Sequence, residues 1–399
     1  MGFFAERLGR IKLSPSTAAT MRARELRAQG YDIIALTIGQ PDFNTPEHVK
    51  AGVMAALARN ETKYPPIDGI PELREAAARK FQRENGLNYT ADQIMVGTGS
   101  KQIIFNAMLA TMEAGDEAII PAPYWISYLD MVLVADGTPV EVPCTAESGF
   151  KLTPTQLEAA ITPRTKWLLL NSPNNPTGAV YSRAELRGLA DVLLKHPHVW
   201  VLTDDIYEHL RFDNIEFATI AQVEPQLYDR TLTVNGVSKA YAMTGFRLGY
   251  AAGPKDLIKN IVKLQSQSTA GVSSISQWAA VEALNGPQEF IPMRAAEFQA
   301  RRDRVLQLFK DIPGMQPNYP EVAFYMFVRC GDLFGKKTRA GKVIANETDM
   351  VLHLMDNGVA VVVGAAYGMS PYFRMSIATD IASLEEACRR MARAAKELT

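Results

Sequence analysis

Short apolar runs recur along the first three quarters of the chain, each about as long as one buried strand. They lie at 93–96, 117–121, 140–142, 167–170, 199–203 and 248–252, and alternating β-forming residues at 231–234 predict a further strand. Segments with helical periodicity precede or separate these runs, at 46–60, 71–85, 97–112, 155–161 and 182–195. The alternation predicts an α/β fold, with a mostly parallel central sheet covered by helices on both faces.

The pattern changes after Gly286-Pro287, where a long charged helical stretch at 288–310 begins. Beyond it we predict strands at 322–330, 359–363 and 372–377, and helices at 348–357 and 383–398. We therefore expect a large domain over 46–287 and a smaller α+β domain over 288–399. The N-terminal segment 1–45, with a predicted helix at 15–30 and a strand at 33–38, is expected to pack with the smaller domain.

The composition adds few constraints to this picture. The chain has 399 residues, 47% of them hydrophobic, and a net charge of -1, so no nucleic-acid or acidic-membrane partner is predicted. It contains no apolar run of 18 residues and no secretory leader pattern in its first 17 residues. Cys144, Cys330 and Cys388 lie too far apart for a disulfide framework or a zinc site. We expect a cytoplasmic protein without a structural metal.

Polar residues and glycines follow several of the predicted strands. Ligands of parallel α/β sheets bind at the carboxyl ends of the strands, so these residues are expected to meet in one site. The set comprises Gly99, Ser100, Lys101, Trp125, Asn175, Asp204, Tyr207, Lys239 and Arg247.

These residue types together fit one small molecule. A helix that begins at Gly99–Lys101 offers free backbone N–H groups to a phosphate, with Arg247 beside it. Lys239 can bond an aldehyde carbon once its amine has lost a proton. The remaining residues suit the parts of a ring. Asp204 can pair with a protonated ring nitrogen, and Trp125 can stack on the ring face. Tyr207 and Asn175 can donate hydrogen bonds to a phenolate oxygen. Pyridoxal 5'-phosphate has all these groups.

Other interpretations of these residues remain open at this point. A lone lysine is usually exposed, and a glycine-rich turn between strand and helix often binds nothing. A phosphate-binding module without covalent chemistry is one alternative. A nicotinamide dehydrogenase ranks last, because Gln102 stands where a dinucleotide fingerprint needs a small residue. In contrast, Arg374 lies within an apolar strand and is costly there without an anionic partner.

Eight segments share a family pattern: GQPDFNTPEHV (39–49), TKYPPIDGIPELREA (62–76), GTGSKQ (97–102), PAPYWISY (121–128), NSPNNPTGAVY (171–181), DDIYEHL (204–210), VNGVSKAYAMTGFRLGYAAGP (234–254) and FRMSIAT (373–379). Through them the sequence resembles the class I aminotransferases of fold type I, and among these the bacterial aspartate aminotransferases. The resemblance covers nearly the whole chain.

The resemblance implies roles at matching positions. Lys239 forms a Schiff base with pyridoxal phosphate and then moves a proton, while Asp204 and Tyr207 tune the ring. The implied cofactor contacts are Tyr64, Gly99, Ser100, Lys101 (through its backbone), Trp125, Asn175, Asp204, Tyr207, Ser238, Lys239 and Arg247. The implied substrate contacts are Gly39, Trp125, Asn175 and Arg374. Tyr64 matches a tyrosine that reaches the neighbouring subunit's phosphate, so a homodimer with shared active sites is implied.

The implied reaction is ping-pong transfer of an amino group from aspartate, or a similar amino acid, to 2-oxoglutarate. An aromatic amino acid or prephenate is the next choice of substrate, and a β-eliminating lyase is a more distant alternative. Three positions depart from the family pattern. Gln40 and Val322 are expected to flank the substrate pocket. The third is Gly236, which has no side chain to bind the phosphate, so Ser238 and Arg247 are expected to provide more of this binding. Asp205 is expected to be the solvated neighbour of Asp204.

Overall fold

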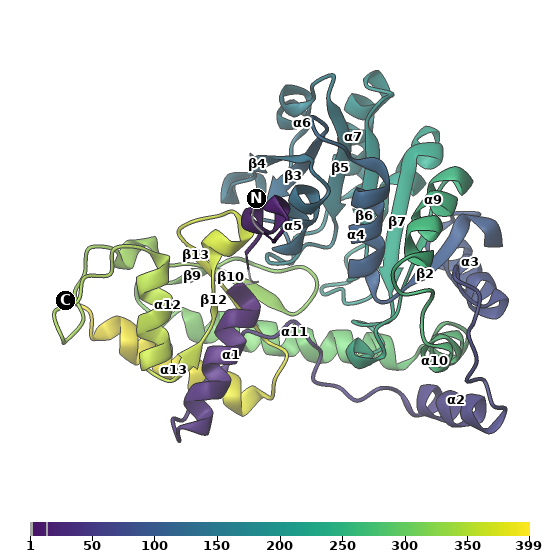
Figure 1. The fold of residues 1–399 in the computed structure, drawn as a ribbon. Coiled ribbons are helices and arrows are strands. Elements are labelled where there is room, and N and C mark those ends of the chain that lie inside the picture. The colour runs from purple at the N-terminus through teal and green to yellow at the C-terminus, as the bar shows by residue number, and fades with distance from the viewer. Residues whose placement is uncertain (1–2, 13–14) are drawn as a thin grey trace.

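The structure is a computed structural model that describes residues 3–12 and 15–399 (Figure 1). Within these residues the largest sheet has seven strands in the order β2-β8-β7-β6-β5-β3-β4. Their bounds are Ile94–Gly97 (β2), Glu117–Ala122 (β3), Thr138–Pro143 (β4), Thr165–Asn171 (β5), Trp200–Asp204 (β6), Thr231–Gly236 (β7) and Gly249–Ala252 (β8). All neighbours pair in parallel except β8, which runs antiparallel to β7 and β2. The predicted, mostly parallel sheet is confirmed.

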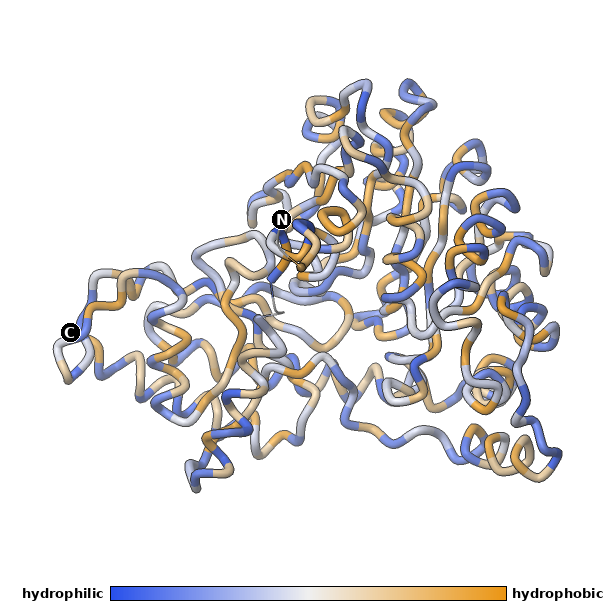
Figure 2. Tube along the Cα trace, in the orientation of Figure 1, coloured by the Kyte–Doolittle hydropathy of each residue, from blue (hydrophilic) through white to orange (hydrophobic). Residues whose placement is uncertain are grey.

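Helices cover both faces of this sheet. They include α3 (Pro71–Asn85), α4 (Ser100–Thr111), α5 (Ser127–Val134), α6 (Pro154–Ala160), α7 (Arg183–Lys195), α8 (Ile220–Val223), α9 (Lys255–Ser266) and α10 (Ser274–Asn285). Helix α2 (Glu47–Ala58) packs against α10. Successive residues of β5 show the consequence: Trp167 and Leu169 join the cluster under α4, α5 and α9, whereas Leu168 and Leu170 join the cluster under α7. Both faces are buried, so the strand carries a continuous apolar run over 167–170, and Figure 2 shows the inner strands as largely hydrophobic.

The C-terminal part forms a separate four-stranded antiparallel sheet in the order β12-β13-β10-β9. Its elements are α11 (Phe290–Phe309), β9 (Gln316–Pro317), β10 (Tyr325–Arg329), α12 (Glu347–Asp356), β11 (Val359–Ala360), β12 (Val362–Val363), β13 (Tyr372–Ser376) and α13 (Ile381–Lys396). From the N-terminal segment, β1 (Ile34–Ala35) pairs with β11, and α1 (Pro15–Ala28) lies beside this unit (Figure 1). We propose the domain division at 45/46 and 287/288 on these grounds.

Contacts cross this proposed division at several places. The long helix α11 runs between the two parts (Figure 1), with Ile291 in the core under α3 and α10 and Phe298 in the core of the smaller unit. Near the N-terminus, Arg10 forms an ion pair with Asp136 at 2.8 Å, just beyond α5 of the large unit. The N-terminal segment therefore contacts both parts and does not pack with the smaller one alone.

Several elements differ from the sequence prediction. The strand expected at 359–363 is divided, because β11 pairs with β1 whereas β12 pairs with β13, and the chain passes from one sheet to the other at Val361. The strand expected at 33–38 shortens to β1, because its pairing partner β11 has only two residues. Helix α10 was not predicted. It is buried on most sides, so it lacks the one-sided apolar pattern that identifies a surface helix. In the described part of the chain, no helix is both long and apolar enough to cross a bilayer.

Candidate active site

A cavity of about 360 Å³ lies where the carboxyl ends of the large-sheet strands face the smaller unit. Every predicted site residue except Tyr64 lines it: Gly39, Gly99, Ser100, Lys101, Trp125, Asn175, Asp204, Tyr207, Ser238, Lys239, Arg247 and Arg374. Tyr64 is 97% exposed and lies elsewhere on the surface. The strand-end rule thus brings together residues separated by up to 335 positions in sequence, from Gly39 to Arg374.

Lys239 lies in the loop that joins β7 to β8. Its ammonium donates a 2.7 Å hydrogen bond to the carbonyl of Gly39 and lies 5.7 Å from the ring centre of Tyr207. Burial, reinforced by the positive charge of Arg374, lowers the pKa of Lys239 to about 8. A sizeable fraction of this amine is therefore neutral, and nucleophilic, near neutral pH.

The pH dependence of amine labelling provides a direct check on Lys239. With no cofactor bound, modification of Lys239 by an amine-directed reagent should rise with a midpoint near pH 8, because the neutral amine is the reactive form. An ordinary lysine would respond about two units higher, near 10.4. Peptide mass spectrometry after short exposures measures the rate, with exposed Lys310 in the same digest as the reference. A Lys239 midpoint at or above pH 10 would contradict this prediction.

Asp204 ends β6 at the floor of the cavity, and its two carboxylate oxygens differ. Oδ2 accepts a 2.7 Å hydrogen bond from the hydroxyl of Tyr128, whereas Oδ1 is buried without a partner among the described residues. Burial raises the pKa of Asp204 to about 6, although the Tyr128 hydrogen bond opposes this rise. An unpaired buried carboxylate oxygen is costly, so this atom suits a cationic N–H donor from a ligand.

Asp205 is not solvated, so the sequence expectation for it was wrong. Its side chain is buried and accepts a 2.6 Å hydrogen bond from Thr203. Burial, with the negative charge of Glu208 nearby, raises its pKa to about 8. The physical reason is that helices cover both faces of the sheet, so both neighbours at the end of β6 point into the interior.

An anion-binding corner forms where α4 begins. Gly99 precedes the helix with a φ of +80°, and a Cβ there would lie 2.6 Å from the Nη2 atom of Arg247. Glycine therefore lets the guanidinium lie against the helix start, where the helix dipole and free N–H groups favour a negative group. Ser100 and buried Ser238 line the same cavity.

The side chain of Lys101 was not singled out from sequence, which assigned only its backbone. Its ammonium lies 4.8 Å from the ring centre of Trp125 and faces the cavity. Burial and the charge of Arg247 lower the pKa of Lys101. Among the described residues that line the cavity, Asp204 is the single carboxylate, against four cationic side chains, so the cavity favours anionic ligands.

Arg374, on β13, is buried at 3% exposure without a carboxylate partner in the described part of the chain. Its guanidinium donates to Asn175 Oδ1 at 3.1 Å and to the Thr37 carbonyl at 2.6 Å, while Nε has no partner there. The rings of Tyr325 and Tyr367 lie 4.5 and 5.2 Å away. A buried guanidinium with an unpaired Nε–H suits a planar carboxylate ligand.

Sequence reasoning missed two tyrosines and misplaced one residue. The Tyr325 hydroxyl hydrogen-bonds that of Tyr207 at 2.9 Å, and Tyr128 bonds Asp204 as described above. A signal existed for Tyr128, because it is an aromatic residue that follows soon after Trp125 and the end of β3. Gln40 lines the cavity as expected, but Val322 does not: it is buried in an apolar cluster to which both units contribute.

The strand ends gather a lysine of lowered pKa, a buried aspartate and an arginine without an acidic partner among the described residues. They lie around a helix start that suits an anion. This arrangement defines the class of fold-type-I aminotransferases. The chain belongs to the family of class I and II aminotransferases, whose family model matches residues 31–391. It is an aminotransferase.

The known relatives match it over nearly their whole length. A probable aspartate/prephenate aminotransferase from Rhizobium leguminosarum bv. phaseoli is 55% identical over 394 residues, which cover 98% of each chain. An aspartate/prephenate aminotransferase from Cereibacter sphaeroides is 55% identical over 392 residues, again 98% of each. The crystal structure of the aspartate aminotransferase from Rhizobium meliloti matches with a TM-score of 0.97 at 54% identity, covering 100% of both chains.

Proposed function

We propose that this aminotransferase uses pyridoxal 5'-phosphate to move an amino group from aspartate, or a similar acidic amino acid, to 2-oxoglutarate. The observation that carries the proposal is two cations in one cavity: Arg374, buried with no acidic partner among the described residues, and Lys101, which lines the same space. A dicarboxylic substrate supplies one carboxylate for each. The printed names of the relatives, aspartate and aspartate/prephenate aminotransferases, support the same substrate class.

The residues present fit the proposed cofactor. Asp204 has a free buried oxygen for a ring N–H, Lys239 has an amine of lowered pKa for an aldehyde, and α4 has an open N-terminus for a phosphate. When bound, pyridoxal phosphate supplies an electron sink next to the substrate α-carbon.

Each residue of the chain then has a proposed task. Lys239 fixes the cofactor covalently and moves the proton at the substrate α-carbon, which its pKa of about 8 suits. Asp204 keeps the ring nitrogen protonated. Arg374 and the backbone of Gly39 orient the substrate α-carboxylate. The other proposed contacts are Tyr207 and Asn175 to the phenolic oxygen, Trp125 to the ring face, and Gly99, Ser100, the Lys101 backbone, Ser238 and Arg247 to the phosphate.

We propose a cytoplasmic homodimer in which Tyr64 completes the partner subunit's site. Tyr64 is 97% exposed and Met54 is 66% exposed, and large apolar side chains this open in one chain suit an interface. The three cysteines are free and buried, which fits a reducing compartment.

Prephenate is a second candidate for the amino acceptor. It carries a second carboxylate, as 2-oxoglutarate does, so Arg374 and Lys101 suit both molecules. The relatives named aspartate/prephenate aminotransferase at 55% identity favour this candidate.

A half-reaction screen tests the proposed function. The protein, loaded with pyridoxal phosphate, is mixed with single amino acids, and loss of the cofactor's visible absorbance reports amino transfer. Aspartate and glutamate should react best. Lys101→Gln should weaken these two by about tenfold and leave alanine and phenylalanine unchanged, since it removes a charged hydrogen-bond partner of the side-chain carboxylate alone. Arg374→Lys serves as the matched variant and should weaken every amino acid alike, because an ammonium cannot reproduce the two-pronged guanidinium.

Two results would count against the proposal. A wild-type protein that never alters the bound cofactor with acidic amino acids would refute the substrate class. If Lys101→Gln weakened the reaction with acidic and with neutral amino acids equally, Lys101 would not be the residue that binds the side-chain carboxylate. Repeating the second half-reaction with 2-oxoglutarate and with prephenate separates the two proposed acceptors.

A further inference from the structure

A buried polar cluster lies behind the floor of the active site. Lys80, on α3, is fully buried, and its ammonium donates to Glu208 and, at 2.8 Å, to Asn85 Oδ1. Asn85 in turn donates to Glu208 Oε2 at 2.8 Å. Burial opposes the ionisation of Glu208, but the Lys80 ammonium keeps its pKa below the ordinary value. The cluster therefore contains a true ion pair in the interior.

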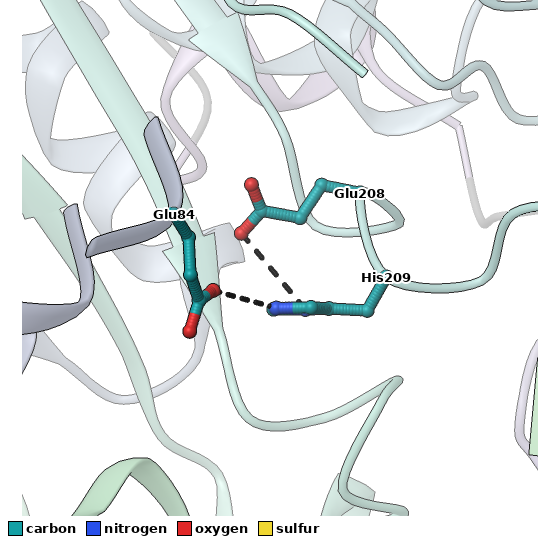
Figure 3. A group of neighbouring side chains, drawn as sticks. All are labelled: Glu84, Glu208 and His209. Carbon is teal, nitrogen blue, oxygen red and sulfur yellow. Dashed lines mark hydrogen bonds and ion pairs between the residues drawn. The ribbon is translucent and has the colours of Figure 1, made fainter. Parts of the chain in front are cut away.

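Figure 3 shows the outer part of this cluster, where Glu84, Glu208 and His209 point toward one another. Their ligand-type atoms lie within 4.8 Å, a spacing that a metal ion could use. The cationic position is nevertheless taken by the protein itself. Lys80 contacts Glu208 and lies 3.6 Å from Glu84, which also bonds His209 at 2.8 Å. The cluster is thus internally paired, and its function must be sought in what it holds.

Glu208 connects to the anion-binding corner through one residue, Asn235 near the end of β7. The Asn235 amide donates to Glu208 Oε1 at 2.6 Å, and its Oδ1 accepts from the backbone N–H of Gly236 at 2.7 Å. Its backbone carbonyl accepts the hydroxyl of Ser100 at 2.9 Å. Ser100 is the first residue of α4, so a continuous series of hydrogen bonds runs from Lys80 to the helix start.

Gly236 fits this arrangement sterically. A Cβ at position 236 would lie 2.9 Å from Ser100 Oγ and 3.1 Å from Gly249 Cα. The Ser100 hydroxyl therefore occupies the space next to the strand that a side chain at 236 would need. This gives a physical reason for a glycine at position 236.

We infer that the buried Lys80–Glu208 ion pair is a positioning device for the cofactor phosphate: it holds Asn235, and Asn235 holds Ser100 at the start of α4. Desolvation makes a buried ion pair a weak source of stability, so its use here is to fix geometry. The inference rests on the proposed use of pyridoxal phosphate. Lys80, Glu208 and Asn235 do not line the cavity, and they act only through Ser100 and Gly236.

Comparison of two cofactor forms tests this inference. Protein freed of cofactor is titrated with pyridoxal 5'-phosphate and with pyridoxal, which lacks the phosphate, and the absorbance change gives each Kd. In Glu208→Gln, the Kd for pyridoxal phosphate should rise by about tenfold, the size typical of residues that orient ligand-binding groups. The Kd for pyridoxal should stay within about twofold, since the phosphate corner does not contact it. Asn235→Ala, which spares the ion pair, should give the same selective loss.

Glu117→Gln provides the matched control. Glu117 is also buried and paired, with Arg164 at 2.6 Å, but it lies at the opposite end of the sheet, at the start of β3. It should leave both Kd values unchanged. If Glu208→Gln does not fold, Asn235→Ala decides the question alone. Equal weakening of both cofactor forms, or no weakening, would overturn the inference while wild-type binding keeps the proposed function intact. A wild-type protein that binds neither form would overturn both.

Discussion

Lys239→Ala should slow transamination by at least about four orders of magnitude, because it removes both a covalent attachment and a general acid–base group. Among the residues that the structure describes, the other lysine lining the cavity is Lys101, which lies beside Trp125, whereas Lys239 lies by the Gly39 carbonyl and the Tyr207 ring. Steady-state rates with aspartate and 2-oxoglutarate measure the loss. Added methylamine should restore part of the rate, since a free amine can move the proton that Lys239 moves.

Borohydride treatment of the loaded protein gives an independent readout of the same residue. In the wild type, the pyridoxyl mass should appear on the peptide that contains Lys239, and in Lys239→Ala it should disappear. Lys101→Gln keeps Lys239 and should retain the label. Near-normal turnover of Lys239→Ala, or a label on another peptide of the wild type, would remove Lys239 from the proposed mechanism.

Asp204→Asn should lower the rate by roughly two to three orders of magnitude, the usual cost of losing one preorganised electrostatic partner. Asparagine keeps the shape and the Tyr128 hydrogen bond but cannot balance a protonated ring nitrogen. A pH signature should accompany the loss. In the unliganded chain Asp204 is ionised above a pKa of about 6, and the ionised form is the one that pairs with a cationic N–H. Wild-type cofactor affinity should therefore fall as pH drops through about 6, and Asp204→Asn should lack this step.

Asp205→Asn is the matched control for Asp204→Asn. Asp205 is the adjacent residue and is equally buried, but it does not line the cavity. Its pKa of about 8 keeps it mostly protonated at neutral pH, so an amide is a close substitute. The control should retain most of the activity. Comparable losses in both variants would indicate a general disturbance of the end of β6 and count against the ring-nitrogen assignment.

The regular elements were predictable because their signals are local. Helix α3 begins and ends at the predicted residues, since Pro71 suits the first helical position and Gly86 ends the helix with a φ of +64°. The strands of the large sheet have continuous apolar runs because helices bury both faces, and this pattern is visible without tertiary information. The gathering of the site also followed from sequence, because parallel strands present their carboxyl ends on one edge.

The errors share a different physical origin. Asp205 is buried, Val322 joins an apolar core and the Lys101 ammonium faces the cavity, and each of these placements depends on elements distant in the chain. The local sequence around a charged residue at a strand end does not indicate whether water or a helix covers that residue in the fold. Tyr325 illustrates this point: its strand pattern marks it as core, while its hydroxyl reaches Tyr207 across 118 positions.

By itself the sequence determined the sheet type, the strands of the large sheet and which residues stand at their ends, because these depend on spacing along the chain. Helices α5, α9 and α10 were not predicted. Only the tertiary structure decided which charges are buried and which lack a partner. Arg374 meets Asn175 and Thr37 across 199 and 337 positions, and Lys239 meets Gly39 across 200. Desolvation and Coulomb interactions act through space. The lowered pKa of Lys239 and the unpaired hydrogen-bonding atoms of Asp204 and Arg374 therefore exist only once the chain is folded.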